Sequence, residues 1–186
     1  MNISYTTERL RLTTLKAHDA DMVLDFYNRN RSHFEPWEAK RSFNFYTLSY
    51  QRTSLAFEER LMKRNNMLRF WIYLKDRPDS IIGTINYYNI KEGKQPSCQI
   101  GYKIDHEHTK MGYAYEAIQY SMSEVIERYN LHRIEAKIMP SNLPSINLIQ
   151  KLGFKYEGLA NLKIKINGNW QDHLLYAYTN KNKLKL

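Results

Sequence analysis

The chain has 186 residues, of which 42% are hydrophobic and 25% charged, and its formal net charge is +9. This composition is typical of a globular protein, so we expect one domain over residues 1–186. No apolar run approaches the roughly 18 residues of a membrane span, and the first residues lack the apolar core of a signal peptide. We therefore expect a cytoplasmic protein without membrane contact. The surplus of basic residues is compatible with a polyanionic partner. Because the positive residues are scattered along the sequence, the charge alone does not indicate such a partner.

The first third of the chain is predicted to contain one strand and two helices. Leucines alternate with arginines over Glu8–Leu15, which indicates a strand. Asp19 is the expected cap of the helix that follows. A second amphipathic helix, less regular than the first, is expected over Leu48–Lys63.

Three further strands are expected in the middle of the chain. Two of them, Arg69–Lys75 and Ile81–Tyr88, are separated by the turn-forming residues Asp76–Ser80. The next runs from Cys98 to Ile104, where apolar and polar residues alternate. The single cysteine excludes an internal disulfide, and its place in a half-buried strand favours a core residue over a nucleophile.

The stretch Gln99–Ala117 (QIGYKIDHEHTKMGYAYEA) is the most informative part of the sequence. A strand, a short turn that contains Gly112 and the start of a long helix follow one another directly. Backbone N–H groups at a helix start, together with the helix dipole, favour an anion there. Gly112 lets the backbone approach that anion, and Ala114 is small enough not to block it. The alternative is an ordinary tight turn, and a single G-x-A does not exclude it.

The last third is predicted to contain a fifth strand, a helix and a hairpin. Arg133–Met139 alternates as a strand, after the long helix ends near Tyr129. Pro144 suits the first turn of a helix, and Gly153 suits its left-handed end. Asn167 and Gly168 form the strongest short-range hairpin signal in the chain. These elements predict one α+β domain with a mostly antiparallel sheet.

Motifs along nearly the whole chain resemble GNAT N-acetyltransferases, and more narrowly the RimJ/RimL group, which acetylates amino-terminal residues of ribosomal proteins. The resemblance rests on TERLRL, NRSHFEPWE, IIGTINYYNI, IGYKID followed by GYAYEA, HRIEAKIMPSNLPSINLIQKLGFKYEG and INGNWQDHLLYA. The pattern N-x-x-S-x-x-L-x-x-K-L-G-F-x-x-E-G, from Asn142 to Gly158, is specific. The sequence PWE at Pro36–Glu38 and the later NGNWQDH resemble the RimJ side of the group.

The resemblance implies the GNAT fold: a central, mostly antiparallel mixed sheet with helices on both faces and splayed fourth and fifth strands. It also implies acetyl-CoA as cosubstrate, held between those two strands with its pyrophosphate on the turn Lys110–Tyr115. Thr109 and Lys110 depart from the family's usual Q/R-x-x-G-x-G/A loop. Lys110 either contacts a phosphate, which we favour, or points into water. The residues implied for cofactor binding are Ile104, Lys110, Met111, Gly112, Tyr113, Ala114, Tyr115, Asn142 and Ser145.

Direct acetyl transfer needs an uncharged amine, a donor to the oxyanion and a proton for the departing thiolate. The resemblance implies a backbone N–H near Tyr102 or Lys103 as the oxyanion donor. It implies Ser145 as the proton source, unless Ser145 only caps its helix or packs against it. Asn142 is expected to fix the pantetheine arm or the substrate amine, because its amide does not titrate. Gln99 stands where the family often has glutamate, so no general base is assigned.

The amino-terminal α-amine of a ribosomal protein, with an alanine or serine terminus, is the leading acceptor. At pH 7.5 an α-amine is roughly one-third neutral and a lysine only about 0.1% neutral. A small amine, such as a polyamine, amino acid or aminoglycoside, is a rival acceptor. Small cationic acceptors need acidic pocket walls, and the loop offers only Glu35 and Glu38. A non-catalytic domain that binds RNA or the ribosome is a further rival, although Gly112, Ala114 and Ser145 are all present.

The aromatic loop is the candidate acceptor-binding segment, through Phe34, Trp37 and Glu38. Its aromatic side chains either cover a pocket or fill the core, and the sequence leaves both alternatives open. His106 and His108 resemble a metal pair only superficially, and we expect them to be solvated turn residues, with no metal in the protein. Contact with the ribosome or RNA remains open, direct DNA binding is not expected, and the protein is expected to be a monomer or homodimer.

Overall fold

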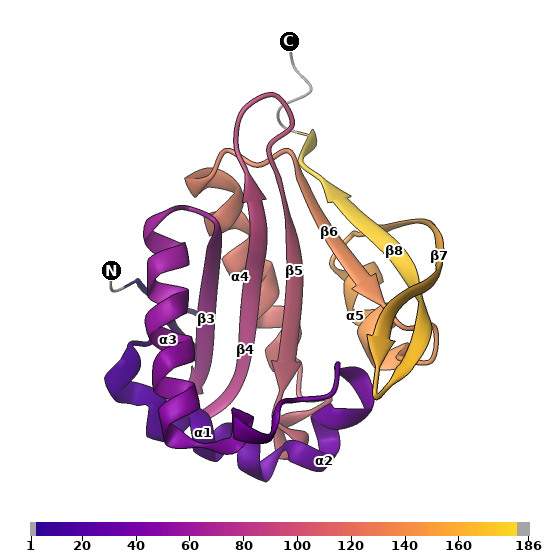
Figure 1. Ribbon diagram of the computed structural model, residues 1–186. Coiled ribbons are helices and arrows are strands. Elements are labelled where there is room, and N and C mark those ends of the chain that lie inside the picture. Colours follow the sequence, from indigo (N-terminus) through magenta and orange to yellow (C-terminus); the bar gives the residue numbers. More distant parts are fainter. Residues whose placement is uncertain (1–2, 182–186) are drawn as a thin grey trace.

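A computed structural model describes residues 3–181, which form an eight-stranded sheet with helices on both faces (Figure 1). The strands are β1 (Ser4–Thr6), β2 (Leu10–Thr13), β3 (Met67–Leu74), β4 (Arg77–Lys91), β5 (Ser97–Ile104), β6 (Arg133–Ile138), β7 (Lys155–Ile166) and β8 (Asn169–Thr179). The helices are α1 (Ala20–Arg29), α2 (Arg31–Phe34), α3 (Leu48–Lys63), α4 (Tyr113–Arg128) and α5 (Leu143–Lys151). Short 3-10 turns are η1 (Ala17–Asp19), η2 (Glu35–Trp37), η3 (Phe43–Tyr46) and η4 (His106–His108).

The strand order is β1-β2-β3-β4-β5-β6-β8-β7, and among the described residues only the β5–β6 pair is parallel. This confirms the predicted α+β domain with a mostly antiparallel mixed sheet. Within residues 3–181, no helix has the length and apolar character that crossing a membrane requires.

Two hydrophobic clusters lie on opposite faces of the sheet. The larger one joins α4 and α5 to the central strands, through residues such as Ile118 and Ile149, which are fully buried. The smaller one joins α1 and α3 to β3, through Phe26, Leu55 and Trp71. The helices therefore cover both faces of the sheet, with α4 and α5 on one face and α1 and α3 on the other.

Several sequence predictions are confirmed closely. Helix α3 has the predicted bounds, and Cys98 is buried in β5. Gly153 has φ 88°, as a left-handed helix end requires, and Phe154 N–H donates to the Ile149 carbonyl at 3.1 Å. Asn167 and Gly168 both have positive φ, 47° and 85°, which is the geometry of a two-residue hairpin turn.

Other predictions need correction. The first strand is shorter than Glu8–Leu15, and β1 was missed because three residues show no clear alternation. The turn after β3 is not Asp76–Ser80, since β4 already begins at Arg77. Asp19 stands at the N-cap position of α1, but its carboxylate accepts the Lys16 N–H at 2.7 Å and makes no cap bond to α1.

Candidate active site

The strands β5 and β6 pair at one end and then separate. Their parallel register joins Ser97, Cys98 and Gln99 to Arg133, Ile134 and Glu135, although β5 continues to Ile104 and β6 to Ile138. Figure 1 shows the two ribbons diverging below that short pairing. This confirms the splayed fourth and fifth strands that the family resemblance implied. They are numbered β5 and β6 here because the short β1 adds one strand before them.

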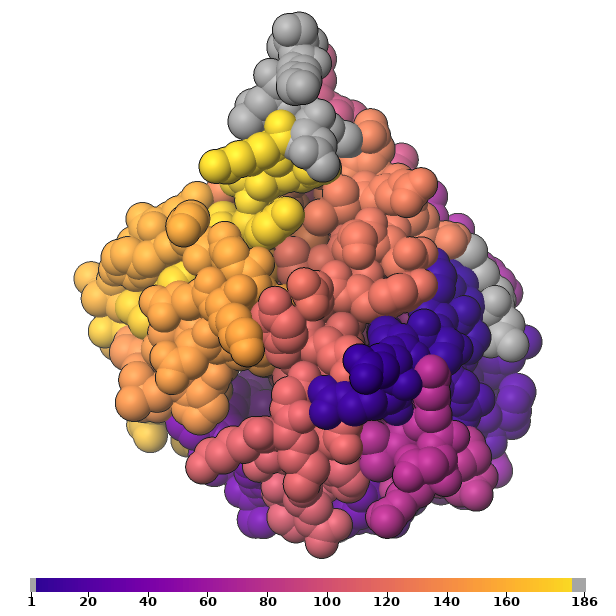
Figure 2. Space-filling view, turned by 180° about the vertical axis from the view of Figure 1, so that it is seen from behind, coloured from indigo at the N-terminus to yellow at the C-terminus, as the bar shows by residue number. Residues whose placement is uncertain are grey.

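The space beside the splay is hollowed at the surface. Figure 2 shows a hollow between the salmon surface around the end of β5 and the start of α4 and the orange surface of α5 and β7, with purple atoms from the early chain at its bottom. On the far side, the Asn167 side-chain amide of the hairpin turn donates to the Glu35 carbonyl of η2 at 2.8 Å. The gap is therefore bounded by strand pairing at one end and by this contact at the other.

The start of α4 has the features of an anion cradle. Gly112 occupies the N-cap position with φ 83°, and no side chain caps the helix there. The N–H groups of the first helical turn, at Tyr113, Ala114 and Tyr115, have no hydrogen-bond acceptor within the helix, because no earlier turn supplies one. Lys110 precedes them with φ 61° and is exposed. This turn, residues 110–115, is called the cofactor turn below, and its geometry fits a pyrophosphate.

Arg9 and Glu116 hold the cofactor turn from the β1–β2 connection. The Arg9 guanidinium donates to the Met111 carbonyl at 3.0 Å, and its Nε contacts a Glu116 carboxylate oxygen at 2.7 Å. The same carboxylate accepts the Thr7 hydroxyl at 2.6 Å and the Arg9 N–H at 2.9 Å. Burial would raise the pKa of Glu116, but these hydrogen bonds and the charge of Arg9 lower it.

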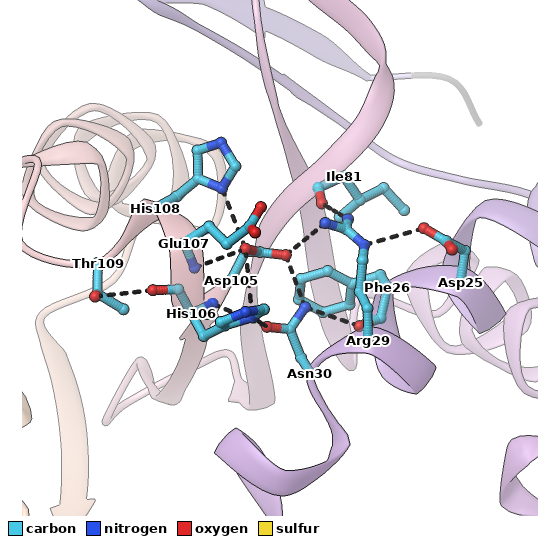
Figure 3. Close-up of polar contacts among 10 residues, drawn as sticks. All are labelled: Asp25, Phe26, Arg29, Asn30, Ile81, Asp105, His106, Glu107, His108 and Thr109. Carbon is cyan, nitrogen blue, oxygen red and sulfur yellow. Dashed lines mark hydrogen bonds and ion pairs between the residues drawn. The ribbon is translucent and has the colours of Figure 1, made fainter.

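A second network holds the segment before the turn from the side of α1 (Figure 3). Asp105, fully buried at the end of β5, accepts Arg29 Nη1 at 2.6 Å and Asn30 Nδ2 at 2.8 Å. It also accepts the Glu107 N–H at 3.0 Å and lies 3.2 Å from His108 Nδ1. Burial would raise the pKa of Asp105, but the hydrogen bonds and the charge of Arg29 lower it. Asp105 thus joins α1 to the segment that leads into the cofactor turn.

Tyr102 and Ser145 form a hydroxyl pair between β5 and α5. Their oxygen atoms are 2.6 Å apart, and the Tyr102 hydroxyl also lies 3.2 Å from the Ser145 carbonyl. Burial raises the pKa of Tyr102, and the hydrogen bond with Ser145 offsets only part of that rise. Asn142 caps α5 by accepting the Ser145 N–H at 3.2 Å. The structure therefore brings together all three predicted catalytic residues, with Tyr102 protonated at neutral pH.

The opposite face of β5 carries charge instead of hydroxyl groups. Lys103 points away from the Tyr102 side, as alternation along a strand requires. Its ammonium pairs with Glu38, which also pairs with Arg41, so these three residues join β5 to the loop after η2. Gln99, on the same face, accepts a hydrogen bond from Lys137 of β6 at 3.1 Å. Residues 35–41 are called the acceptor loop below.

The aromatic residues of this region occupy different environments. Phe34 is buried in the smaller cluster, with its ring 5.4 Å from that of Phe26, so it fills the core. Trp37 is 38% exposed and is the aromatic side chain of the acceptor loop that remains open to a ligand. Glu35 pairs with Arg31 at 2.7 Å. The sequence left the pocket and core alternatives open; the structure places Phe34 in the core, and whether Trp37 covers a pocket stays a prediction.

His106 and His108, in the turn after β5, make more polar contacts than the sequence predicted. His106 Nδ1 lies 3.0 Å from Asn30 Oδ1, although its side chain is half exposed. The His108 side chain is only 16% exposed because it contacts Asp105, so the prediction of a solvated residue is wrong there. Among residues 3–181, no three His, Cys, Asp or Glu side chains gather in a way that could hold a metal ion.

Sequence reasoning missed the residues that support the cofactor turn and the segment leading into it. Arg9 lies within TERLRL, so the motif contained a signal, but its contact with Met111 crosses 102 positions. Asp105 and Asn30 are 75 positions apart, and neither belongs to a periodic pattern. Only the fold brings such pairs together.

A model of the acetyltransferase (GNAT) domain matches residues 9–155. The chain therefore belongs to the GNAT acetyltransferase family, and it is an N-acetyltransferase.

More particular likenesses lie within the RimJ/RimL group. The chain is 31% identical to the [ribosomal protein uS5]-alanine N-acetyltransferase of Escherichia coli (strain K12), over 95% of this chain and 91% of that protein. The crystal structure of the ribosomal-protein-S5-alanine acetyltransferase from Vibrio fischeri is 33% identical, with a TM-score of 0.91 over 97% of this chain and 98% of that one. Mycobacterium smegmatis RimJ in complex with CoA-disulfide is 27% identical, with a TM-score of 0.87 over 94% of this chain and 83% of that one.

Proposed function

We propose that the protein transfers the acetyl group of acetyl-CoA to the amino-terminal α-amine of a ribosomal protein with an alanine or serine terminus. One observation favours this acceptor over a small polycation. Both acidic side chains of the acceptor loop are already paired with cations of the chain: Glu35 with Arg31, and Glu38 with Lys103 and Arg41. The loop therefore offers no free carboxylate to a polyamine or an aminoglycoside. The names of the similar proteins point to the same class of acceptor.

The α-amine also suits a site without an evident general base. Gln99 lies on the same face of β5 as Lys103, accepts a hydrogen bond from Lys137, and cannot take a proton. An amine with a pKa near 7.8 is roughly one-third neutral at pH 7.5, against about 0.1% for a lysine, so the α-amine starts with a few-hundred-fold advantage. Proton removal through water is then sufficient, and the enzyme would run near neutral pH in the cytoplasm.

Acetyl-CoA would supply the activated thioester, and the chain would position it. The N–H groups of the cofactor turn hold the pyrophosphate, and Lys110 adds a charged contact. Ile104, Met111, Tyr113 and Tyr115 border the cofactor, with Asn142 beside the pantetheine arm. A backbone N–H near Tyr102 or Lys103 stabilises the oxyanion.

The hydroxyl pair supplies the proton that the departing thiolate needs. Ser145 donates it, and the 2.6 Å hydrogen bond with Tyr102, which burial keeps protonated, orients the Ser145 hydroxyl. The proton that the attacking amine loses returns to Ser145 through water, so the net proton transfer runs from the amine to the sulfur. On the opposite face, Trp37 and Glu38 border the path of the acceptor, while Phe34 supports that path from the core.

Acetyl-CoA turnover with peptides that differ only in their first residue tests this proposal. Peptides with a free alanine or serine terminus should react, whereas the same peptides with a blocked terminus and one lysine should react at least about a hundredfold more slowly, following the neutral fractions. Mass spectrometry locates the acetyl group. Equal rates for blocked and free termini would contradict the α-amine proposal, and faster turnover of spermidine or a free amino acid would favour the small-amine alternative.

A further inference from the structure

A second polar cavity lies beside the acceptor face. It has a volume of about 120 Å³ and lies between α3, the end of the acceptor loop and the strands β3 and β5. Its charged lining residues are Arg41, Glu58, Arg69 and Lys103. Lys103 and Arg41 also hold Glu38 of the acceptor loop, so the cavity adjoins the path proposed for the acceptor.

The charges around this cavity do not balance. Three cations, Arg41, Arg69 and Lys103, face two carboxylates: Glu58, which lies 2.7 Å from Arg69, and Glu38, which pairs with the other two cations. The wall therefore keeps one positive charge beyond its own pairs. The side chains of these cations are only 19% to 30% exposed, so their excess charge is costly unless a counter-charge or water offsets it.

Arg69 also carries a donor that has no partner. Its Nε atom is buried and, among the described residues, makes no hydrogen bond, although Nη1 of the same guanidinium reaches Glu58. Buried charged donors without partners are rare, and they indicate a water, an ion or a ligand group that completes the site. A guanidinium recognises a carboxylate especially well, because its fork of N–H groups matches the two oxygens.

We propose that this cavity is a subsite for a carboxylate of the acceptor, and specifically for an acidic side chain that follows the reacting amine. This inference rests on the proposed function, because it places the acceptor on the Lys103 face of β5. The carboxylate contacts Arg69 and Lys103, and it completes the charge balance of the wall. Acceptors that carry a glutamate near the terminus are therefore preferred over those that carry the neutral amide.

Paired peptides test the subsite in the full-length enzyme. Each pair has the same free alanine terminus and differs only by glutamate or glutamine at position 2, 3 or 4. We expect kcat/KM to be about tenfold higher for glutamate at one of these positions, as a charge-assisted hydrogen bond predicts. Arg69→Gln should remove that preference while leaving the KM for acetyl-CoA and the rates with glutamine peptides unchanged.

Two further variants keep the test decisive. Arg11→Gln is the matched control, because Arg11 is a partly exposed arginine on β2 that contacts Tyr73 and the Pro78 carbonyl and does not line this cavity; it should keep the preference. Glu58→Gln removes the competing carboxylate but keeps Arg69, so it should raise the glutamate preference several-fold. If Arg69→Gln does not fold, Glu58→Gln alone tests the subsite. An unchanged preference for glutamate peptides in that variant would overturn the proposal.

The possible failures can be told apart. If no peptide is acetylated, the proposed acceptor class is wrong. If peptides are acetylated but glutamate and glutamine react equally at all three positions, the subsite is wrong and the acceptor class stands. A free amino acid could supply the same carboxylate, so free glutamate is also assayed as an acceptor. If Arg69 is required for the acetylation of free glutamate but peptides show no preference for glutamate, the proposed subsite for a peptide side chain is wrong.

Discussion

The cofactor turn and the acceptor loop face the same gap, but they are held in different ways. The cofactor turn depends on backbone geometry: a left-handed Gly112, free N–H groups at the start of α4 and an arginine that contacts the Met111 carbonyl. The acceptor loop depends on ion pairs among Glu38, Arg41 and Lys103. Backbone geometry changes little between related sequences, whereas side-chain pairs change with single substitutions. The difference suits an enzyme with a constant cosubstrate and an acceptor that varies between relatives.

The largest effect is expected at Asp105, which joins α1 to the segment that leads into the cofactor turn. Asp105→Asn removes the negative charge that accepts hydrogen bonds from Arg29 and Asn30, so we expect a loss of about 3 kcal/mol in the free energy of unfolding. Thermal denaturation should show a decrease in Tm of about 6–12 °C. Asp25→Asn is the matched control, because Asp25 pairs with the same arginine at 3.0 Å but is exposed, and it should cost less than about 1 kcal/mol.

The pH dependence of this variant gives a second check. Because the pKa of Asp105 is lowered in the folded protein, its contribution is present above the unfolded value near 3.9 and is lost as pH falls through the lower folded pKa. The difference in stability between the wild type and Asp105→Asn should therefore shrink in acid. A difference that stays constant from pH 7 to pH 3 would show that the charge of Asp105 contributes nothing.

Ser145→Ala separates chemistry from binding in the gap itself. We expect kcat to fall about a hundredfold, since a positioned proton donor contributes that much, with little change in the dissociation constant for acetyl-CoA. Ser123→Ala is the control, because that exposed hydroxyl on α4 contacts only the Tyr120 and Gln119 carbonyls of its own helix. An unchanged kcat would move the acid role to Tyr102 or to water, and Tyr102→Phe would then distinguish these two.

Gly112→Val tests the backbone geometry of the cofactor turn. A branched residue at φ 83° is strained, and a Cβ there would lie 3.3 Å from Arg9 Nη2. We expect the dissociation constant for acetyl-CoA to rise about tenfold, measured by calorimetry. Gly93→Val carries similar strain at φ 91° but has open space around it, so it should leave this constant unchanged. Equal binding by the two variants would contradict the anion cradle.

The smallest effect is expected for the acceptor loop. Glu38→Gln removes two partly exposed ion pairs, so the KM for the peptide acceptor should rise about threefold while kcat and the KM for acetyl-CoA stay the same. High salt should bring the wild type toward the variant, because it screens the same pairs. Glu59→Gln breaks an exposed pair with Lys63 on α3 and serves as the control. A larger rise in the KM for acetyl-CoA than in the KM for the peptide would contradict the assignment of this loop to the acceptor.

The sequence predicted what depends on local patterns. The hairpin at Asn167 and the left-handed end of α5 at Gly153 are each encoded by one or two residues, so they were predicted. Gly112 was predicted only as the glycine of a turn where the backbone can approach an anion, without its left-handed φ. The Arg9–Met111 and Asp105–Asn30 contacts were not, because each joins segments that only the sheet brings together. The unbalanced cavity around Arg69 was missed for the same reason: in the sequence, Arg69 is simply one more polar position in a strand.

The contact between Asn167 and Glu35 has a consequence for the timing of the reaction. Together with the short β5–β6 register, it bounds the gap at both ends, so the proposed acceptor would enter end first. Under the proposed function, a terminus that extends freely from its own protein would fit this opening. A ribosomal protein would therefore have to be modified while its first residues are still unburied, before assembly covers them.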